Sequence, residues 1–240
     1  MPRCTTKVKE IQSLLRELKE LPEFRARAGL LYPIAGMVAL MVLATFAGVV
    51  RGQRDLAAFA RTLSQGQRRV LGFRMDRKTR RIRCPKETAF FRVLKAVEDD
   101  RLERILLRWQ EKMLGPINDG LIAIDGKTLR HARGVELVSS FGVESGRWLG
   151  TIAVAQKSNE IPAAQQLLDR QELEGKLVVM DALHTPDVTA KKIVFEKGGD
   201  YVFTLKKNQQ TLYETLEKKL QAQPFSPSTQ GGNPGPAPGA

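Results

Sequence analysis

Two aspartates stand in similar settings and could together carry out metal chemistry. Asp125 sits in the apolar run LIAID, directly before Gly126, and Asp181 closes the apolar run KLVVMD. Such runs predict buried central strands, where an unpaired charge is costly, so something must compensate each carboxylate. Two carboxylates brought together at adjacent strand ends would form a hard oxygen site suited to Mg²⁺ or Mn²⁺. A site of this kind supports in-line displacement at a phosphodiester.

Each aspartate also has a plainer interpretation when it is taken singly. An Asp that follows an apolar strand often caps a turn or the next helix, and the residues alone leave this alternative open for both. The similar settings of the pair, with the order of the strands around them, favour the metal site. His131 and His184 form no Ser/His/Asp arrangement with a nucleophile elbow, and the sequence contains no P-loop. Neither a serine-type hydrolase nor a nucleotide hydrolase is therefore predicted.

The elements that must position the aspartates are expected to form a mixed sheet. Short β-branched and apolar runs predict an antiparallel meander, after which helices and strands alternate. The expected strands are residues 121–130, 135–144, 148–156, 176–183 and 201–207, and the expected helices are residues 161–173, 186–198 and 210–221. This βββαβαβα order predicts a sheet flanked by helices, and it is the order of the ribonuclease H-like fold.

The first half of the chain shows helical periodicity instead. Helices are expected at residues 7–20, from Pro33 to Val50, at residues 55–63 with Asp55 as N-cap, and from Lys86 to Lys112, with a basic, loop-rich connection at residues 66–83. Gly115 and Pro116 mark the boundary. We expect an α/β protein with an N-terminal all-α, DNA-binding domain at residues 1–116, a mixed-sheet catalytic core at residues 117–223, and a disordered Pro/Gly-rich tail at residues 224–240.

Positive charge is concentrated in this first half. The formal net charge is +13, and residues 1–119 carry 25 Lys and Arg against 13 Asp and Glu, whereas residues 120–240 carry 14 against 13. Such a concentration suits duplex DNA, because cations that neutralise phosphates release condensed counterions. Arginine forks suit bidentate phosphate contacts, and the candidate DNA-binding arginines are Arg68, Arg69, Arg80 and Arg81. A solvated basic surface and an anionic membrane surface are the alternatives.

One uncharged stretch bears on the membrane alternative. Residues 34–50 are 17 residues without a charge, at the short end of the range for a membrane span. Small residues within the stretch, the lack of an aromatic belt and basic residues on both sides favour a helix buried in a helical domain, so no membrane partner is expected. Cys4 and Cys84 form no zinc motif or disulfide framework, and the polar N-terminus is not a signal peptide. We therefore expect a cytoplasmic protein.

Several long segments resemble one family of proteins. AIDGKTLR, LVSSFGVESG, AQKSNEIPAAQQLLD, VVMDALHTPDVTAKKIVFEKGGDYVFTLKKNQ and TLYETLE are similar to the DDE insertion-sequence transposases of the H-repeat-associated group, and the likeness runs from about Pro33 to Ser228. The resemblance implies DNA strand transfer by a ribonuclease H-like core, with Asp125 and Asp181 as the first and second catalytic ligands of Mg²⁺ or Mn²⁺. It implies double-stranded DNA partners, namely the element's terminal repeats and target DNA, and it allows a homodimer on the nucleoid of a bacterium.

The resemblance also implies roles near the site for cationic and amide side chains. Groups of this kind beside a two-metal centre can orient the scissile phosphate and the nucleobases. The candidates are Lys127, Lys157, Asn159, Glu160, His184, Lys207, Asn208 and Gln209. For Glu160 the alternative is a role at the start of the helix that begins at Ile161.

One departure from the family pattern concerns the third acid. In similar proteins a Glu lies downstream, in an HGRxE-like segment shortly after a stretch resembling PFSPST. This chain has PFSPST at residues 224–229, continues as GGNPGPAPGA, and has no acidic residue after Glu217. The pattern predicts a chain truncated at its C-terminus, with an incomplete core whose third metal ligand is missing and whose cleavage is impaired. The alternative is a catalytically inactive DNA-binding remnant.

Overall fold

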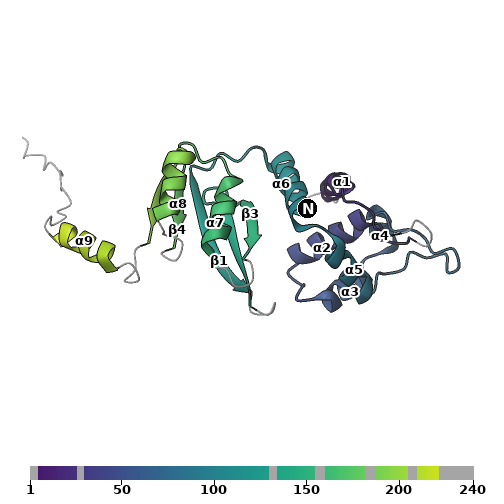
Figure 1. Ribbon diagram of the computed structural model, residues 1–240. Helices are drawn as coiled ribbons and strands as arrows, with labels where there is room; N and C mark the ends of the chain where they lie inside the picture. Colours follow the sequence, from purple (N-terminus) through teal and green to yellow (C-terminus); the bar gives the residue numbers. More distant parts are fainter. Residues whose placement is uncertain are drawn as a thin grey trace, which may run out of the picture.

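The N-terminal half of the computed structural model is a bundle of helices (Figure 1). The structure describes residues 5–25, 30–129, 134–154, 160–181, 187–204 and 210–221. The helices of this half are α1 (Thr5–Leu18), α2 (Ile34–Phe46), α3 (Gln53–Thr62), α4 (Gln65–Val70), α5 (Glu87–Ala96) and α6 (Asp99–Leu114). They share one apolar core, whose buried members include Leu18, Met37, Leu40, Phe90 and Ile105. Burial of these side chains is the main term that holds the bundle together.

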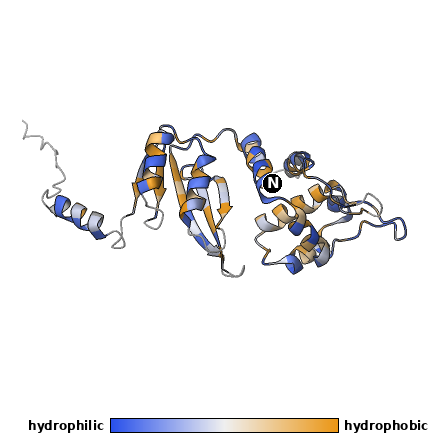
Figure 2. Cartoon of the chain, viewed as in Figure 1, coloured by the Kyte–Doolittle hydropathy of each residue, from blue (hydrophilic) through white to orange (hydrophobic). Residues whose placement is uncertain are grey.

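Helix α2 is the most apolar helix of the bundle, and Figure 2 shows it hydrophobic along its length. Its residues face the core on several sides, as expected for a buried helix. The chain after α4 passes directly over it, because a Cβ placed on Gly36 would lie 2.0 Å from the Leu71 carbonyl oxygen. Among the residues that the structure describes, no helix is both long and apolar enough to span a membrane.

Three local features of the bundle differ from the sequence-based prediction. The last helix expected in this half is two helices, because the chain takes extended geometry at Val97 and Glu98. Helix α4 lies within the connection that was expected to be loop-rich, and a capping box that begins at Ser64 satisfies its first amides. Gly52, not Asp55, occupies the N-cap of α3, so the predicted cap was wrong; Asp55 lies in the first turn instead.

The second half of the chain is built on a five-stranded sheet with the order β3-β2-β1-β4-β5. The strands are β1 (Leu121–Leu129), β2 (Val135–Gly142), β3 (Trp148–Ala153), β4 (Leu177–Met180) and β5 (Asp200–Phe203). Strand β2 is antiparallel to β1 and β3, whereas β4 is parallel to β1 and β5. This arrangement is the ribonuclease H-like one, so the predicted fold class is confirmed: a helical region followed by a mixed α/β sheet.

The helices of this half are α7 (Glu160–Asp169), α8 (Asp187–Lys191), the π-helix η2 (Lys192–Glu196) and α9 (Gln210–Gln221). Helix α7 and η2 pack on the same face of the sheet, because Leu167 and Ile193 share a core with Ile122, Ile124 and Val178 (Figure 1). Side chains alternate along a strand, so the intervening residues of β1 and β4 point to the other face.

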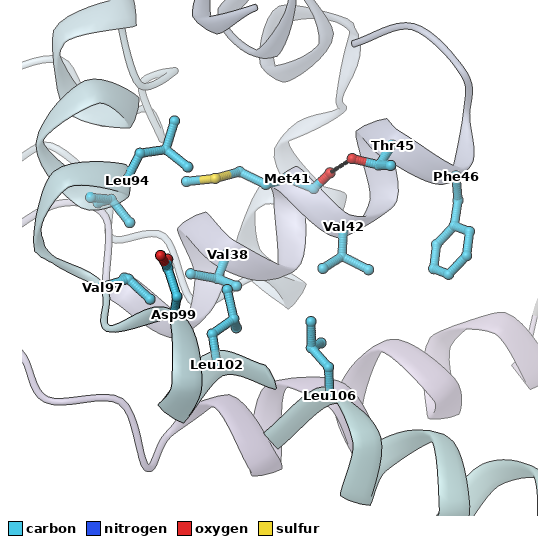
Figure 3. Close-up of a pocket in the computed structure, with 11 residues that line it drawn as sticks. Val38, Met41, Val42, Thr45, Phe46, Leu94, Val97, Asp99, Leu102 and Leu106 are labelled. Atoms are coloured by element: carbon cyan, nitrogen blue, oxygen red, sulfur yellow. Dashed lines mark hydrogen bonds between the residues drawn. The ribbon is translucent and has the colours of Figure 1, made fainter. Parts of the chain in front are cut away.

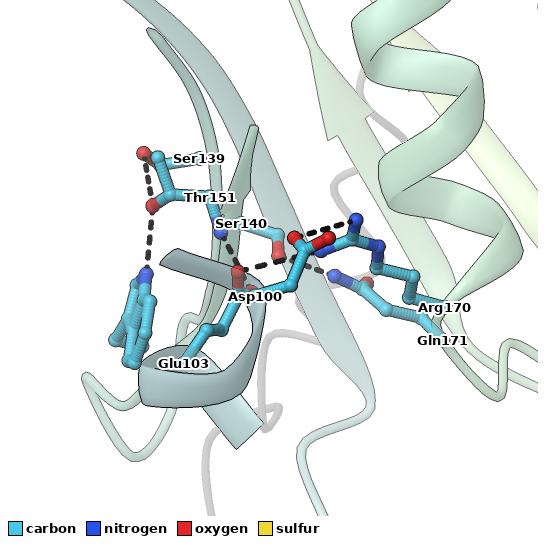
Figure 4. Close-up of polar contacts among 8 residues, drawn as sticks. Asp100, Glu103, Ser139, Ser140, Thr151, Arg170 and Gln171 are labelled. Carbon is cyan, nitrogen blue, oxygen red and sulfur yellow. Dashed lines mark hydrogen bonds and ion pairs between the residues drawn. The ribbon is translucent and has the colours of Figure 1, made fainter. Parts of the chain in front are cut away.

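Helix α6 joins the bundle to the sheet. Ile105 of α6 is buried in the helical core. On another side of the same helix, Glu103 accepts a hydrogen bond from the Thr151 amide of β3 at 3.1 Å and pairs with Arg170 at 3.3 Å (Figure 4). Arg170 also pairs with Asp100 at 3.1 Å. One helix therefore belongs to the helical core and is hydrogen-bonded to the sheet.

A buried carboxylate ties α1 to α6. Glu17 is only 6% exposed, and its carboxylate accepts hydrogen bonds from Arg108 Nε at 2.9 Å and Lys112 Nζ at 2.8 Å. The hydrogen bond from Lys112, aided by the charges of both partners, outweighs desolvation and holds the pKa of Glu17 below its ordinary value.

We expect Glu17→Gln to lower the free energy of unfolding by about 1.5–3 kcal/mol at neutral pH, the scale of hydrogen bonds to charged groups. A depressed carboxyl pKa stabilises the fold above the unfolded-state pKa, about 4.3 for Glu, and this stabilisation is lost as pH falls through the folded-state pKa. Urea unfolding across this range should show the variant and the wild type converging at low pH. Glu10→Gln, on an exposed position of α1, is the matched control. A Glu17→Gln deficit that is independent of pH would contradict the argument.

Candidate functional site

The two aspartates lie where the β1–β4 ladder ends. The parallel register ends with the pair of Ile124 and Met180, and Asp125 and Asp181 are the residues that directly follow this pair. Neighbouring strands are about 4.8 Å apart. Ile124 points into the core beneath α7, so Asp125, the next residue of β1, belongs to the opposite face of the sheet, and Asp181 directly follows the end of β4.

Asp125 was expected at the end of its strand, but the structure places it within β1. Strand β1 continues to Leu129 because it pairs with β2 beyond this point, with Lys127 opposite Leu137. The Asp125 side chain is 56% exposed, and its Oδ2 lies 3.8 Å from Nζ of Lys127, which is 79% exposed. The expectation of a buried charge in need of compensation was therefore wrong for Asp125. Water solvates this carboxylate, and an exposed pair of this kind contributes at most about 1 kcal/mol.

The arrangement offers hard oxygen ligands on an accessible face. On the same face Phe141 is 38% exposed and Val202 is 51% exposed, so a large substrate can approach the aspartates. Among the described residues, no group of three or more His, Cys, Asp or Glu is placed to hold a metal ion. What this part of the chain supplies is a pair of carboxylates, which fits the chemistry of a divalent cation that takes its other ligands from water or substrate.

Glu160 approaches the same strand from the other side. A Cβ placed on Gly126 would lie 2.6 Å from Oε1 of Glu160, so this carboxylate rests over Gly126. Gly126 faces α7, as Ile124 does, whereas Asp125 faces away from it. Glu160 is also the first residue of α7, where an acid interacts favourably with the helix dipole. The backbone of β1 thus separates Glu160 from the Asp125 side chain.

Six candidates of the catalytic half lie outside the described residues: Lys157, Asn159, His184, Lys207, Asn208 and Gln209. The strands that precede them can still be compared. Strands β3, β4 and β5 all run parallel to β1, and they end at Ala153, Met180 and Phe203. These three ends lie at the edge of the sheet where Asp125 and Asp181 stand.

The four candidate DNA-binding arginines have different surroundings. Arg68 donates hydrogen bonds to the carbonyl oxygens of Ile82 at 3.1 Å and Arg61 at 3.0 Å, so its guanidinium is used within the fold. The other three, Arg69, Arg80 and Arg81, are exposed, and their side chains make no hydrogen bond or ion pair within the described part of the chain. Of the four candidates, these three have a guanidinium group that is available to bind phosphate.

Asp76 was not among the predicted site residues, although it organises the basic connection. Its carboxylate accepts hydrogen bonds from the amides of Lys78 and Thr79, two and three residues ahead. Asp side chains favour local turns of this kind. The sequence Asp76-Arg77-Lys78-Thr79, an Asp followed by polar residues, was therefore the signal from which this turn could have been predicted. The lack of apolar periodicity at residues 66–83 predicted only a loop-rich connection.

An apolar groove lies between α2, α5 and α6 in the helical bundle (Figure 3). Its volume is about 340 Å³, and its lining is apolar apart from Thr45 and Asp99. Phe46 belongs to the lining and is 76% exposed. A groove without several convergent polar groups does not support catalysis, so it is not a candidate active site.

Each half of the chain matches a known protein family. Residues 15–110 match a family described as DDE_Tnp_1-associated, and residues 118–234 match a family described as Transposase DDE domain. Over 218 residues the chain is 27% identical to YbfL and 26% identical to the H repeat-associated protein YhhI, both from Escherichia coli (strain K12). Each alignment covers 88% of this chain and 55% of the relative, so the chain spans about half the length of these relatives.

One solved structure with a similar chain is the piggyBac transposase synaptic complex with hairpin DNA. The sequence identity is 12% and the TM-score is 0.42, and the match covers 92% of this chain and 52% of that one.

Proposed function

Because the chain belongs to the DDE-type transposases, we propose that it is an insertion-sequence transposase that carries out metal-dependent phosphodiester cleavage and strand transfer on DNA. The observation that supports this proposal is that Asp125 and Asp181 directly follow the last pair of the β1–β4 ladder, with the Asp125 side chain exposed. The strand order supports it, since this order brings the two carboxylates to one edge.

The two aspartates are proposed as the carboxylate ligands of Mg²⁺ or Mn²⁺. When bound, such ions activate the attacking oxygen and stabilise the leaving oxygen of a phosphodiester. Lys127 lies on the same face as Asp125, two residues further along β1, where its ammonium can bind the phosphate backbone of the substrate. The family resemblance extends this substrate-positioning role to Lys157, Asn159, His184, Lys207, Asn208 and Gln209.

Double-stranded DNA is the proposed partner, as element ends and as target. We assign its initial binding to residues 1–116 and the chemistry to residues 117–223, because the excess of positive charge lies in the first half and both aspartates lie in the second. Arg69, Arg80 and Arg81 are proposed phosphate contacts, while Arg68 has a structural role. A homodimer on DNA and a cytoplasmic, nucleoid-associated location are parts of the same proposal.

A second candidate function is DNA binding without cleavage. The observation that favours it is that the part of the chain described by the structure holds no cluster of three metal-ligating side chains. Two carboxylates supply at most four oxygens to two cations, so a second ion would be held loosely. We therefore propose that residues 1–240 cleave DNA poorly unless another acid completes the site.

The metal site can be tested by titration of the protein with Mn²⁺, followed by calorimetry or by electron paramagnetic resonance. We expect Asp125→Asn and Asp181→Asn each to weaken binding by about tenfold or more, because each removes a hard anionic ligand. Asp200→Asn is the matched control, since Asp200 is exposed on the same face but at the opposite end of the ladder. Equal isotherms for the wild type and both aspartate variants would place the metal elsewhere.

A further inference from the structure

A turn within the basic connection projects from the helical bundle, beyond α4 and away from the sheet (Figure 1), and Figure 2 shows it to be hydrophilic. Asp76 closes this turn through both its backbone and its side chain. The Asp76 amide donates to the Arg81 carbonyl at 3.0 Å, and the Arg80 amide donates to the Asp76 carbonyl at 2.9 Å. Arg80 has φ +54, a left-handed geometry that reverses the chain. We call residues 76–81 the Asp76 turn.

The Asp76 carboxylate holds the inside of this turn. Its Oδ1 accepts hydrogen bonds from the amides of Lys78 at 2.8 Å and Thr79 at 2.9 Å, and its Oδ2 lies 2.8 Å from Nε of Arg83. The hydrogen bond from Thr79, together with that from Lys78 and the charge of Arg83, keeps the pKa of Asp76 below its ordinary value. The acid is therefore ionised at neutral pH and directed inward.

Both ends of the Asp76 turn are anchored in the bundle. Phe73 before it and Ile82 after it are buried in the helical core, at 4% and 3% exposure. The Ile82 amide donates to Gln65 Oε1 at 2.9 Å, and the Arg68 guanidinium donates to the Ile82 carbonyl at 3.1 Å. The Arg74 amide donates to the Leu31 carbonyl at 2.8 Å. The turn is thus a fixed projection of the fold.

Cations cover the outside of the turn. Arg77, Lys78, Arg80 and Arg81 are exposed, and their side chains make no hydrogen bond or ion pair within the part of the chain that the structure describes. Four like charges in six residues repel one another, so this arrangement is stabilised when an anion lies among them. Holding the cations in place beforehand reduces the entropy that is lost on binding.

We propose that the Asp76 turn is a preformed contact for the phosphate backbone of duplex DNA, with Asp76 as its positioning residue. The inference deepens the proposed function and rests on it. Several cations on a short, fixed projection match the closely spaced phosphates of a duplex, and guanidinium forks bind phosphate oxygens in pairs. The turn lies at the far end of the bundle from the sheet (Figure 1), so it contacts DNA away from the aspartates.

The positioning role of Asp76 determines the sign of the change in DNA affinity when its carboxylate is removed. An acid among DNA-binding cations ordinarily weakens binding, so its removal should strengthen binding through the added positive charge. Here the carboxylate holds two backbone amides and Arg83 in place, so its removal should disperse the cations and weaken binding. The sign of the effect separates a positioning role from a purely electrostatic one.

The test is fluorescence anisotropy of a labelled random-sequence duplex with the 240-residue chain at about 100 mM salt. Asp76→Ala should weaken binding by about tenfold, the loss of roughly one phosphate contact at this salt concentration. Asp76→Asn, whose amide oxygen can still accept the two backbone hydrogen bonds, should retain most of the affinity. Glu98→Ala removes an exposed acid that has no side-chain cap bond, and it should leave affinity unchanged or slightly higher.

A second variant keeps the test independent of any change in the turn's conformation. Arg77→Gln, Arg80→Gln and Arg81→Gln together remove three exposed, unpaired guanidinium groups, so thermal unfolding should be unchanged while the salt slope of log Kd falls by about two to three.

The outcomes separate the turn from the proposed function as a whole. If the wild type binds DNA but Asp76→Ala binds as tightly as Glu98→Ala, or the triple variant keeps the wild-type salt slope, the Asp76 turn is not a DNA contact. If the triple variant loses binding to phosphatidylserine vesicles but not to DNA, the partner of the turn is a membrane surface and the proposal is overturned. If the wild type itself does not bind the duplex, DNA binding by this chain fails together with the turn.

Discussion

The affinity of the 240-residue chain for duplex DNA is expected to fall by roughly a thousandfold between about 50 and 200 mM salt. The excess positive charge lies in the first half of the chain, and a face that neutralises about six phosphates releases a corresponding number of counterions. The measurement is a series of anisotropy titrations at increasing KCl, with log Kd plotted against log salt.

The control for this series is the thermal unfolding curve at each salt concentration, because loss of the fold would also weaken binding. A steep dependence together with constant stability supports binding through phosphates. A salt-insensitive isotherm would contradict the assignment, and so would full binding by a chain in which the exposed cations of residues 1–119 have been replaced while those of residues 120–240 are kept.

A second large effect is expected in DNA cleavage. A duplex that carries the terminal repeats of the element should be nicked by residues 1–240 at least about a hundredfold more slowly than by a chain extended through an HGRxE-like segment. Most of the rate in two-metal phosphoryl transfer comes from positioning and preorganised charge, so a loosely held cation has a large cost. Single-turnover nicking assays in Mg²⁺ and in Mn²⁺ provide the comparison.

Asp125→Ala in the extended chain is the control for that experiment, and it should abolish nicking because it removes a ligand that two cations share. The result that would refute the missing-ligand argument is equal nicking by the two chains, abolished in both by Asp125→Ala. Some residue already present would then serve as the third acid. Glu160 is poorly placed for that role, since its carboxylate rests over Gly126 on the other face of the sheet.

The sequence predicted the sheet well because its periodicity reports which side chains are buried. The expected order of elements along the chain and the antiparallel meander are both confirmed, and the helix expected at residues 210–221 has those bounds. The strand that carries Asp125 and the strand that precedes Asp181 are neighbours, as expected, because β1 and β4 form a parallel pair. Periodicity did not reveal that Asp125 is exposed, because only one face of the sheet carries α7 and η2.

Local hydrogen bonds were harder to predict than burial. The break between α5 and α6 falls at Val97 and Glu98. The spacing of apolar residues is continuous across these two positions, so it did not predict the break. The connection between Ser64 and Arg83 is ordered by side-chain caps, and its apolar content is low, so a search for apolar periodicity could only register it as a loop. Arg68 looked like its neighbours in the sequence, and only the structure shows that its guanidinium holds Ile82 and Arg61.

Helix α6 has a consequence for where DNA would be cut. It is a continuous helix of 16 residues that is packed in the bundle at one side and hydrogen-bonded to β3 at another. Because neighbouring residues of α6 are held by the bundle and by β3, a duplex bound by the bundle would, under the proposed function, present its scissile phosphate to the aspartates at a constant offset. The protein, and not the intervening DNA sequence, would then fix the number of base pairs between the recognised site and the cut.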